Sequence, residues 1–269
     1  MAGRFLAALT RGVATGVSCW LFPDHCRVCG GELIELSRIP VCASCLTSVQ
    51  PLQADYICHQ CGTPFSTARP LDETGRCALC RAGLIAYDAA YAYGYYEGVL
   101  QQLIHLFKYE RVLPLGKVLA RWMLAALPRQ LTIDLIVPVP MHWWRRWRRG
   151  FNQAHVLARH LARATGIRLE KALRRRRLGM PQAGLRAADR RRNVAGAFSV
   201  PHPHRVKGQR VLLVDDVLTT GATAGACARE LKRAGARSVV VLTVARADRR
   251  IWPIALPGAA SQQLVSEVV

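Results

Sequence analysis

Eight of the ten cysteines in this 269-residue chain lie in four CxxC pairs. The pairs are Cys26/Cys29, Cys42/Cys45, Cys58/Cys61 and Cys77/Cys80. Two intervening residues allow both thiolates of a tight turn to face one ion, which is the usual arrangement in a tetrahedral zinc site. Cysteines of a disulfide framework would be spread through the chain, whereas these pairs end at Cys80. The pattern therefore predicts zinc binding in a reducing compartment, and hence a cytoplasmic protein.

The gaps between the pairs indicate how the cysteines are divided between metal ions. Twelve residues separate the first two pairs and fifteen separate the last two, so each gap can form a short hairpin. Consecutive pairing gives two zinc ribbons with two structural Zn²⁺ ions, which is the simplest arrangement. The spacing also allows an interleaved pairing, first with third and second with fourth. Glycines and prolines interrupt the segment, so we expect metal to replace a hydrophobic core there.

The residues after Cys80 follow a different pattern. Alternating tyrosines in residues 87–95 indicate a strand, and apolar residues with helical spacing follow on both sides of Pro114. Further buried strands are expected in three places: residues 133–139, 211–214 and 238–244. Strands that alternate with helices predict an α/β fold with a mostly parallel sheet and helices on both faces. Functional residues are then expected at the carboxyl ends of the strands.

Residues 211–223, with the sequence VLLVDDVLTTGAT, are the most informative segment. The apolar strand brings Asp215 and Asp216 to its carboxyl end, where carboxylates can accept hydrogen bonds from a vicinal diol or hold a hydrated Mg²⁺. The following loop supplies hydroxyl and backbone N–H groups at a helix N-terminus: Thr219, Thr220, Gly221, Ala222 and Thr223. Such a loop favours a monophosphate. A diol site beside a phosphate site predicts a 5-phosphoribosyl ligand. The alternative interpretation of this segment is a buried strand followed by an acidic turn without function.

The charge of the chain favours polyanions. Lys and Arg number 38 against 17 Asp and Glu, a formal net charge of +21, and residues 121–207 hold 20 of the basic residues but only three acidic ones. This balance favours nucleic acid, anionic lipid or phosphorylated metabolites as ligands. No apolar run is long enough to span a bilayer. The arginine runs have the alternative interpretation of solvated surface.

Three tryptophans lie among the arginines of residues 143–149. They are Trp143, Trp144 and Trp147, and their neighbours include Arg146 and Arg149. Arginine resists burial, so we expect an exposed cluster rather than a core element. Unpaired bases can stack on the rings while the guanidinium groups contact phosphates, which predicts single-stranded DNA binding together with residues 174–192.

Residues 211–223 resemble the motif by which type I phosphoribosyltransferases bind 5-phosphoribosyl 1-pyrophosphate (PRPP). Four further segments make the chain similar to the ComF family of competence proteins: residues 95–109 with Lys108-Tyr109, the VPVP of 137–140, the RGFNQ of 149–153, and 190–198. The four CxxC pairs match the double zinc ribbon that precedes this domain in the family. The resemblance covers roughly residues 20–247 and implies a double zinc ribbon (24–84) followed by a phosphoribosyltransferase-like domain (85–247). Residues 1–23 are expected to form an amphipathic segment, with a signal peptide as the alternative, and residues 248–269 form a tail.

The resemblance implies roles for individual residues. Asp215 and Asp216 would bind the ribose hydroxyls and are the candidate catalytic residues, and the loop from Thr219 to Thr223 would bind the 5-phosphate of PRPP with Mg²⁺ as cofactor. The loop after residues 133–139 would face pyrophosphate, with Arg149, Asn152 and Gln153 beside it. Residues 174–192 would form a flexible hood over the site.

Three functional hypotheses follow from the resemblance. The first is a cytoplasmic adaptor in DNA uptake during natural transformation, which binds PRPP and single-stranded DNA, with other proteins of the uptake machinery as candidate partners. The second is an active phosphoribosyltransferase that moves phosphoribose from PRPP to a nitrogen nucleophile. The third is a regulator that senses PRPP without turnover.

Overall fold

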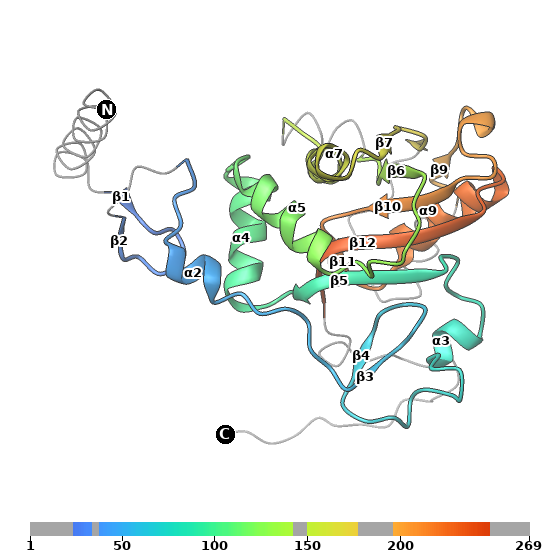
Figure 1. The fold of residues 1–269 in the computed structure, drawn as a ribbon, viewed down its shortest axis with the longest axis horizontal. Coiled ribbons are helices and arrows are strands. Elements are labelled where there is room, and N and C mark those ends of the chain that lie inside the picture. The colour runs from blue at the N-terminus through green and yellow to red at the C-terminus, as the bar shows by residue number, and fades with distance from the viewer. Residues whose placement is uncertain (1–23, 34–37, 142–149, 177–195, 248–269) are drawn as a thin grey trace, which may run out of the picture.

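A parallel β-sheet lies at the centre of the computed structural model, which describes residues 24–33, 38–141, 150–176 and 196–247 (Figure 1). Its strands are β5 (Ala89–Tyr95), β6 (Leu135–Pro138), β7 (Arg168–Leu169), β10 (Arg210–Val214), β11 (Val217–Leu218) and β12 (Ser238–Arg246). The order runs β7, β6, β10, β12, β5, with β11 also paired to β12, and every pair is parallel. The predicted α/β fold is confirmed.

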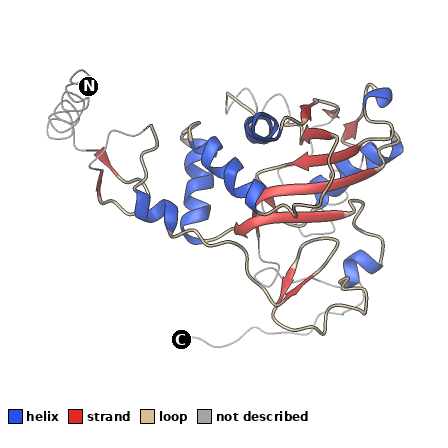
Figure 2. Ribbon diagram, in the orientation of Figure 1, coloured by secondary structure: helices blue, strands red, loops and turns tan. Residues whose placement is uncertain are grey.

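Helices cover both faces of the sheet (Figure 2). They are α4 (Gly98–Tyr109), α5 (Leu115–Ala125), α7 (Gln153–Thr165) and α9 (Ala222–Arg233). Alternate residues of β10 point to opposite faces, as strand geometry requires. Leu212 and Val214 pack in one hydrophobic cluster with α4, α5 and α7, whereas Val211 and Leu213 pack in another with α9. The sheet is therefore buried on both sides, which explains its continuous apolar strands.

The ends of α7 and α5 follow from local sequence. The side chain of Asn152 accepts a hydrogen bond from the N–H of Ala154 and caps the N-terminus of α7. Gly166 ends the same helix in the left-handed conformation, at φ 74°. Pro114 precedes α5 and separates it from α4. The division between α4 and α5 at Pro114 agrees with the sequence pattern.

Asp215 and Asp216 interrupt the strand that carries them. β10 and β11 pair with successive parts of β12, and the two aspartates lie between them. The backbone stays connected there, because the N–H of Asp215 donates to the carbonyl of Leu242 and the carbonyl of Asp216 accepts from Val244. The two aspartates therefore lie between β10 and β11, at the carboxyl edge of the sheet.

The cysteine-rich segment forms two small units on opposite faces of the sheet. The first comprises β1 (Asp24–His25), β2 (Glu32–Leu33) and α2 (Ala43–Thr47), and the second β3 (Tyr56–Ile57), β4 (Pro64–Phe65) and α3 (Ala78–Arg81). The buried cysteines of the first belong to the hydrophobic cluster of α4, and those of the second belong to the cluster of α9. Each unit thus extends the core of one face.

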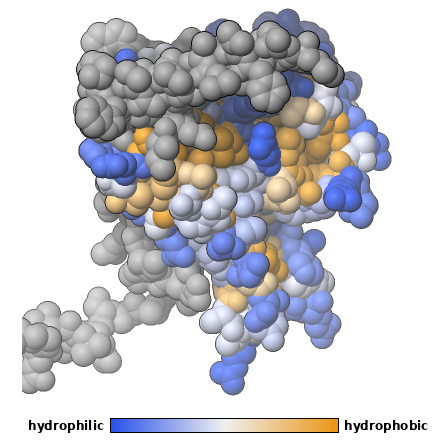
Figure 3. All heavy atoms as spheres, turned by 60° about the vertical axis from the view of Figure 1, so that its left-hand side comes forward, coloured by the Kyte–Doolittle hydropathy of each residue, from blue (hydrophilic) through white to orange (hydrophobic). Residues whose placement is uncertain are grey.

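The remaining described elements are β8 (Arg174–Arg175), paired antiparallel with β9 (Phe198–Ser199), and a short 3-10 helix (Pro203–Arg205). On the face shown in Figure 3, hydrophobic patches are bordered by hydrophilic side chains. Within the described ranges, no helix combines the length and apolar character needed to cross a bilayer. The expected amphipathic segment (1–23) and tail (248–269) lie outside the described residues.

Candidate functional site

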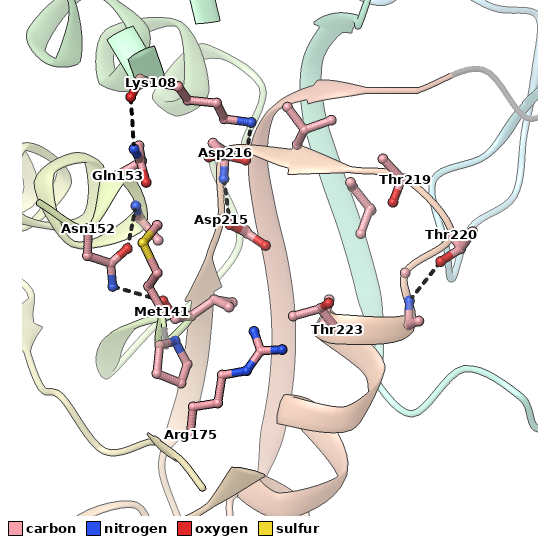
Figure 4. Close-up of a pocket in the computed structure, with 18 of the residues that line it drawn as sticks. Lys108, Met141, Asn152, Gln153, Arg175, Asp215, Asp216, Thr219, Thr220 and Thr223 are labelled. Carbon is pink, nitrogen blue, oxygen red and sulfur yellow. Dashed lines mark hydrogen bonds and ion pairs between the residues drawn. The ribbon is translucent and has the colours of Figure 1, made fainter. Parts of the chain in front are cut away.

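A pocket of about 300 Å³ lies at the carboxyl edge of the sheet (Figure 4). It is lined by the two aspartates that follow β10, by β11, by the loop that leads into α9, and by the first turns of α7 and α9. Asp215, Asp216 and all five residues of the loop from Thr219 to Thr223 line it, together with Asn152 and Gln153. The structure thus brings the described candidate residues into one cavity, at the edge where parallel α/β sheets bind ligands.

Lys108 enters this pocket from the last turn of α4. Its Nζ lies 2.9 Å from Oδ1 of Asp216, and the two side chains are only 13% and 15% exposed. Burial acts to lower the pKa of Lys108, but the charge and the hydrogen bond of Asp216 outweigh it, so the pKa rises above its usual value. The ammonium group therefore stays charged and neutralises one of the two carboxylates.

Asp215 has a different environment from its neighbour. Burial, and then repulsion by Asp216, raise the pKa of Asp215 to about 7. Three weaker effects lower this pKa: the N–H of Asp216 donates to Oδ1 at 2.9 Å, and Lys108 and Arg175 carry positive charge. The two adjacent acids thus differ in environment: Asp216 forms an ion pair with Lys108, whereas the pKa of Asp215 is raised close to neutral pH.

Gly221 shapes the loop before α9. It is the N-cap of the helix with φ 75°, a left-handed conformation that glycine adopts without steric cost. A Cβ at Gly221 would lie 2.7 Å from the hydroxyl oxygen of the fully buried Tyr87. One side of the loop therefore packs against Tyr87, and the other side faces the pocket. The helix N-terminus behind it presents N–H groups that lack intrahelical partners, as an anion site requires.

Asn152 and Gln153, implied as pyrophosphate contacts, are held by the protein itself. Both ends of the Asn152 amide are engaged: Oδ1 caps α7 and Nδ2 donates to the carbonyl of Val139 at 3.1 Å. Gln153 is fully buried and its Nε2 lies 3.5 Å from the carbonyl of Lys108. Its Oε1 has no hydrogen-bond partner among the described residues. Asn152 therefore positions the loop, whereas Gln153 keeps one acceptor at the pocket wall.

Arg175 is the described part of the expected hood that reaches the pocket. It belongs to β8, its guanidinium lies 5.4 Å from the centre of the Phe198 ring, and it points into the cavity in Figure 4. The other hood residues from 177 to 192 lie outside the described part of the chain. So do the tryptophan–arginine candidates: Trp143, Trp144, Arg146, Trp147 and Arg149.

Each cysteine unit gathers four sulfur atoms. One cluster comprises Cys26, Cys29, Cys42 and Cys45, and the other Cys58, Cys61, Cys77 and Cys80. Adjacent pairs along the chain share a cluster, so the structure selects the consecutive pairing over the interleaved one.

The distances between the sulfur atoms suit zinc. Tetrahedral Zn–S bonds of about 2.3 Å place the sulfurs about 3.8 Å apart. The Sγ–Sγ distances are 3.9 Å for Cys26–Cys45 and 3.7 Å for Cys29–Cys42. In the second cluster they are 3.6 Å for Cys58–Cys80 and 3.7 Å for Cys61–Cys77. Both clusters therefore fit Zn²⁺, and the donor set of thiolates alone is typical of structural sites.

Lys108 and Tyr96 line the pocket without having been expected there from the sequence, and Arg175 was expected only as part of the hood. Lys108 lies 108 positions from its partner Asp216, and no local pattern connects them. The sequence signal that could have indicated a buried role for Lys108 is its position at the end of an otherwise apolar helix face.

Two family models match parts of this chain, and similar proteins are found among curated sequences and solved structures. The Phosphoribosyl transferase domain family matches residues 147–253, and the Double zinc ribbon domain family matches residues 17–82. Adenine phosphoribosyltransferase of Mycobacterium marinum is 46% identical over 67 residues, which cover 22% of this chain and 36% of that protein. Among solved structures, an allosteric regulatory enzyme of purine biosynthesis matches 49% of this chain and 26% of its own, with 28% identity and a TM-score of 0.34.

Two relatives match over nearly their whole length. DNA utilization protein YhgH of Salmonella typhimurium is 34% identical over 235 residues, which cover 85% of this chain and 96% of that protein. Competence protein F of Haemophilus influenzae is 31% identical over 234 residues, which cover 84% of this chain and 98% of that protein. Because this similarity spans both the zinc ribbons and the phosphoribosyltransferase domain, the chain belongs to the ComF family of competence proteins.

Proposed function

We propose that this protein acts in the cytoplasm in DNA uptake during natural transformation, and that it binds PRPP and single-stranded DNA. The names of its relatives, competence protein F and DNA utilization protein, support a role with DNA. Other proteins of the uptake machinery are further candidate partners.

The PRPP proposal rests on one observation: Asp215, Asp216 and the loop from Thr219 to Thr223 line the same pocket. Carboxylate oxygens of Asp215 and Asp216 can accept hydrogen bonds from both ribose hydroxyls. The N-terminus of α9 and the threonine hydroxyls suit the 5-phosphate. Mg²⁺ binds proteins through one or two carboxylates together with substrate phosphates, so this donor set fits a Mg²⁺ that enters with PRPP.

The DNA proposal depends on charge and aromatic residues. Residues 121–207 hold 20 basic and three acidic residues, and the tryptophans of residues 143–149 lie within them. Arginine contacts phosphates of any polyanion, whereas tryptophan rings favour unpaired bases. This combination supports single-stranded over duplex DNA.

A second candidate is phosphoribosyl transfer, favoured by the local identity to adenine phosphoribosyltransferase. The C1–O bond of PRPP would break with its electron pair leaving on pyrophosphate, a C1–N bond would form, and the nitrogen's proton would pass to solvent. Asp215 and Asp216 would hold the ribose while the cationic side chains Lys108 and Arg175 offset negative charge around it. A PRPP sensor without turnover would share the same site.

Titration calorimetry with PRPP, in the presence and absence of Mg²⁺ and of a single-stranded oligonucleotide, tests the proposal. Asp216→Asn is expected to lose about 1–3 kcal/mol of PRPP binding free energy, as for a charge-assisted hydrogen bond. Asp55→Asn, at an exposed aspartate of the second zinc unit, is the control and keeps the wild-type affinity. Equal affinities for all three proteins would contradict the assigned pocket.

A turnover assay separates the alternatives. Pyrophosphate release with any nucleobase supports the transferase. Transformation that is lost in a deletion strain and restored by a variant without turnover supports the DNA-uptake adaptor. PRPP binding without an effect of the deletion on transformation supports the sensor.

A further inference from the structure

The two cysteine units differ in how closely they contact the sheet. Gly30 and Gly62 occupy equivalent positions, since each follows the second cysteine of a CxxC pair and has a positive φ, 76° and 63°. A methyl group on Gly30 would meet no atom within 4 Å, whereas one on Gly62 would overlap the carbonyl oxygen of Ala90 in β5. The second unit is therefore docked on the sheet at a point where only glycine fits.

A buried arginine connects this second unit to the sheet. Arg246 is the last residue of β12 and only 1% exposed. Its Nη2 donates to Oγ1 of Thr63 at 2.6 Å, and that hydroxyl lies 2.9 Å from Sγ of Cys61. With Cys61 as a thiolate, the hydroxyl accepts from Arg246 and donates to sulfur. The guanidinium is thus linked to a metal ligand through one hydroxyl group.

The charge of the cluster explains why a cation is buried there. All four cysteines of the second cluster are at most 5% exposed, and four thiolates carry more negative charge than one Zn²⁺ neutralises. A buried charge is costly unless it is paired and hydrogen-bonded. Arg246 supplies the opposite charge, and groups that hydrogen-bond to metal ligands control metal affinity.

The same arginine lies next to the pocket loop along the backbone. Arg246 pairs with Leu218 of β11, and Leu218 immediately precedes Thr219. A second connection runs from Gln60, whose Nε2 donates to the carbonyl of Tyr87 at 2.9 Å. Tyr87 is the residue that packs against Gly221. Both ends of the loop are therefore supported by residues that contact the second cysteine unit.

The first unit offers no such support among its described contacts. It packs on the face that carries α4, and its ion pair with that region, Arg27 to Glu110, is half exposed on both sides. An exposed pair contributes little to stability.

We propose that Arg246 and Thr63 are positioning residues that couple the second zinc site, and not the first, to the order of the loop from Thr219 to Thr223. The effect on PRPP rests on the function proposed above. The coupling between zinc and loop order is independent of it.

Hydrogen exchange of residues 217–224 and zinc retention under chelator challenge test this coupling in matched pairs of variants. Thr63→Val removes the hydroxyl link, and Thr47→Val is its control because that hydroxyl, within the described part of the chain, donates to carbonyls of α2. We expect Thr63→Val to weaken binding of one zinc ion about tenfold or more and to speed loop exchange by a similar factor. Thr47→Val should leave both unchanged.

The second pair is Gly62→Ala with Gly30→Ala as control, since both substitutions carry the same left-handed strain. Faster loop exchange in Gly62→Ala alone is expected. Equal exchange in the two alanine variants, or slow loop exchange in Thr63→Val despite loss of one zinc ion, overturns the coupling. If Gly62→Ala fails to fold, the threonine pair decides. Wild-type protein that shows no PRPP binding refutes the proposed ligand, while the exchange data still test the coupling.

Discussion

At the scale of single residues, Asp215 and Gly221 show how burial and backbone conformation shape the pocket. Asp215 gains its raised pKa because water is excluded and Asp216 lies next to it. Gly221 occupies a conformation and a contact that a side chain would disturb. Neither property is visible in the residue type itself, and each leads to a measurable effect.

The pKa of Asp215, raised from 3.8 to about 7, makes PRPP affinity depend on pH. A diol needs the carboxylate as acceptor, so affinity should rise with pH through neutrality, by up to about tenfold per pH unit below the pKa. Asp215→Asn cannot ionise, and comparison of its pH profile with wild type removes the titration of PRPP itself. Calorimetry between pH 6 and pH 8 measures both. Identical profiles would contradict the role of Asp215.

The same shift predicts the pH dependence of folding stability. The folded protein binds this proton more tightly than the unfolded chain, so the free energy of unfolding should fall as pH rises from about 4 to about 7. In Asp215→Asn this contribution disappears, and the variant becomes more stable relative to wild type above pH 7. Denaturant unfolding at a series of pH values provides the measurement.

Gly221→Ala should destabilise the protein by about 1–2 kcal/mol from left-handed strain alone. Overlap with the Tyr87 hydroxyl adds to this, so the substitution disturbs the loop on the side that packs against Tyr87. Gly225→Ala in α9 is the control, because its Cβ meets no atom within 4 Å, and it should stabilise the helix by about 0.5–1 kcal/mol. Thermal unfolding compares the two, and similar melting temperatures would be inconsistent with the loop geometry.

At the scale of elements, the short helix α2 shows a cysteine with two roles. Cys42 is its N-cap, and its Sγ accepts from the N–H of Cys45 at 3.4 Å. The same sulfur belongs to the first cluster. Capping and metal binding therefore depend on one atom, and a substitution that retains only capping can separate them.

Cys42→Ser keeps a favourable N-cap but replaces a thiolate ligand by a hydroxyl. We expect zinc content to fall from two ions to one per chain, with the first ribbon unfolded and the pocket preserved. Cys227→Ser changes a buried cysteine outside both clusters and should retain two ions. Elemental analysis of protein purified under reducing conditions measures this. Two zinc ions in Cys42→Ser, or fewer than two in wild type, would disprove the assignment.

At the scale of the whole molecule, the net charge of +21 governs the encounter with polyanions. The two cysteine units extend the core on both faces of the sheet, and residues 121–207 hold 20 of the 38 basic residues of the chain. Long-range attraction of this kind increases association rates and is weakened by salt.

Binding of single-stranded DNA should weaken linearly on a log–log plot of affinity against salt concentration, because phosphate contacts release counterions. Trp144→Ala should cost about 1–3 kcal/mol of stacking energy with little change of slope. Arg146→Ala should reduce both affinity and slope. Fluorescence anisotropy with single-stranded and duplex oligonucleotides of equal length provides the measurement. Equal binding of both, together with no loss when all three tryptophans are alanine, would exclude stacking.

Local patterns in the sequence were sufficient for the elements and the main motifs. Cysteine spacing indicated the zinc ribbons, Pro114 marked the division between α4 and α5, and the VLLVDD run predicted a buried strand that ends in two acids. These features are encoded locally, because capping, strand periodicity and metal-binding turns each depend on a few consecutive residues.

Only the tertiary structure decided which distant residues meet. It paired the CxxC motifs consecutively, placed the two units on opposite faces, and brought Lys108 to Asp216 and Arg246 to Thr63. Lys108 and Asp216 are 108 residues apart in the chain, and Thr63 and Arg246 are 183 residues apart. No periodicity connects residues so far apart, since their contact results from the packing of whole elements on the sheet and from the need to pair buried charges.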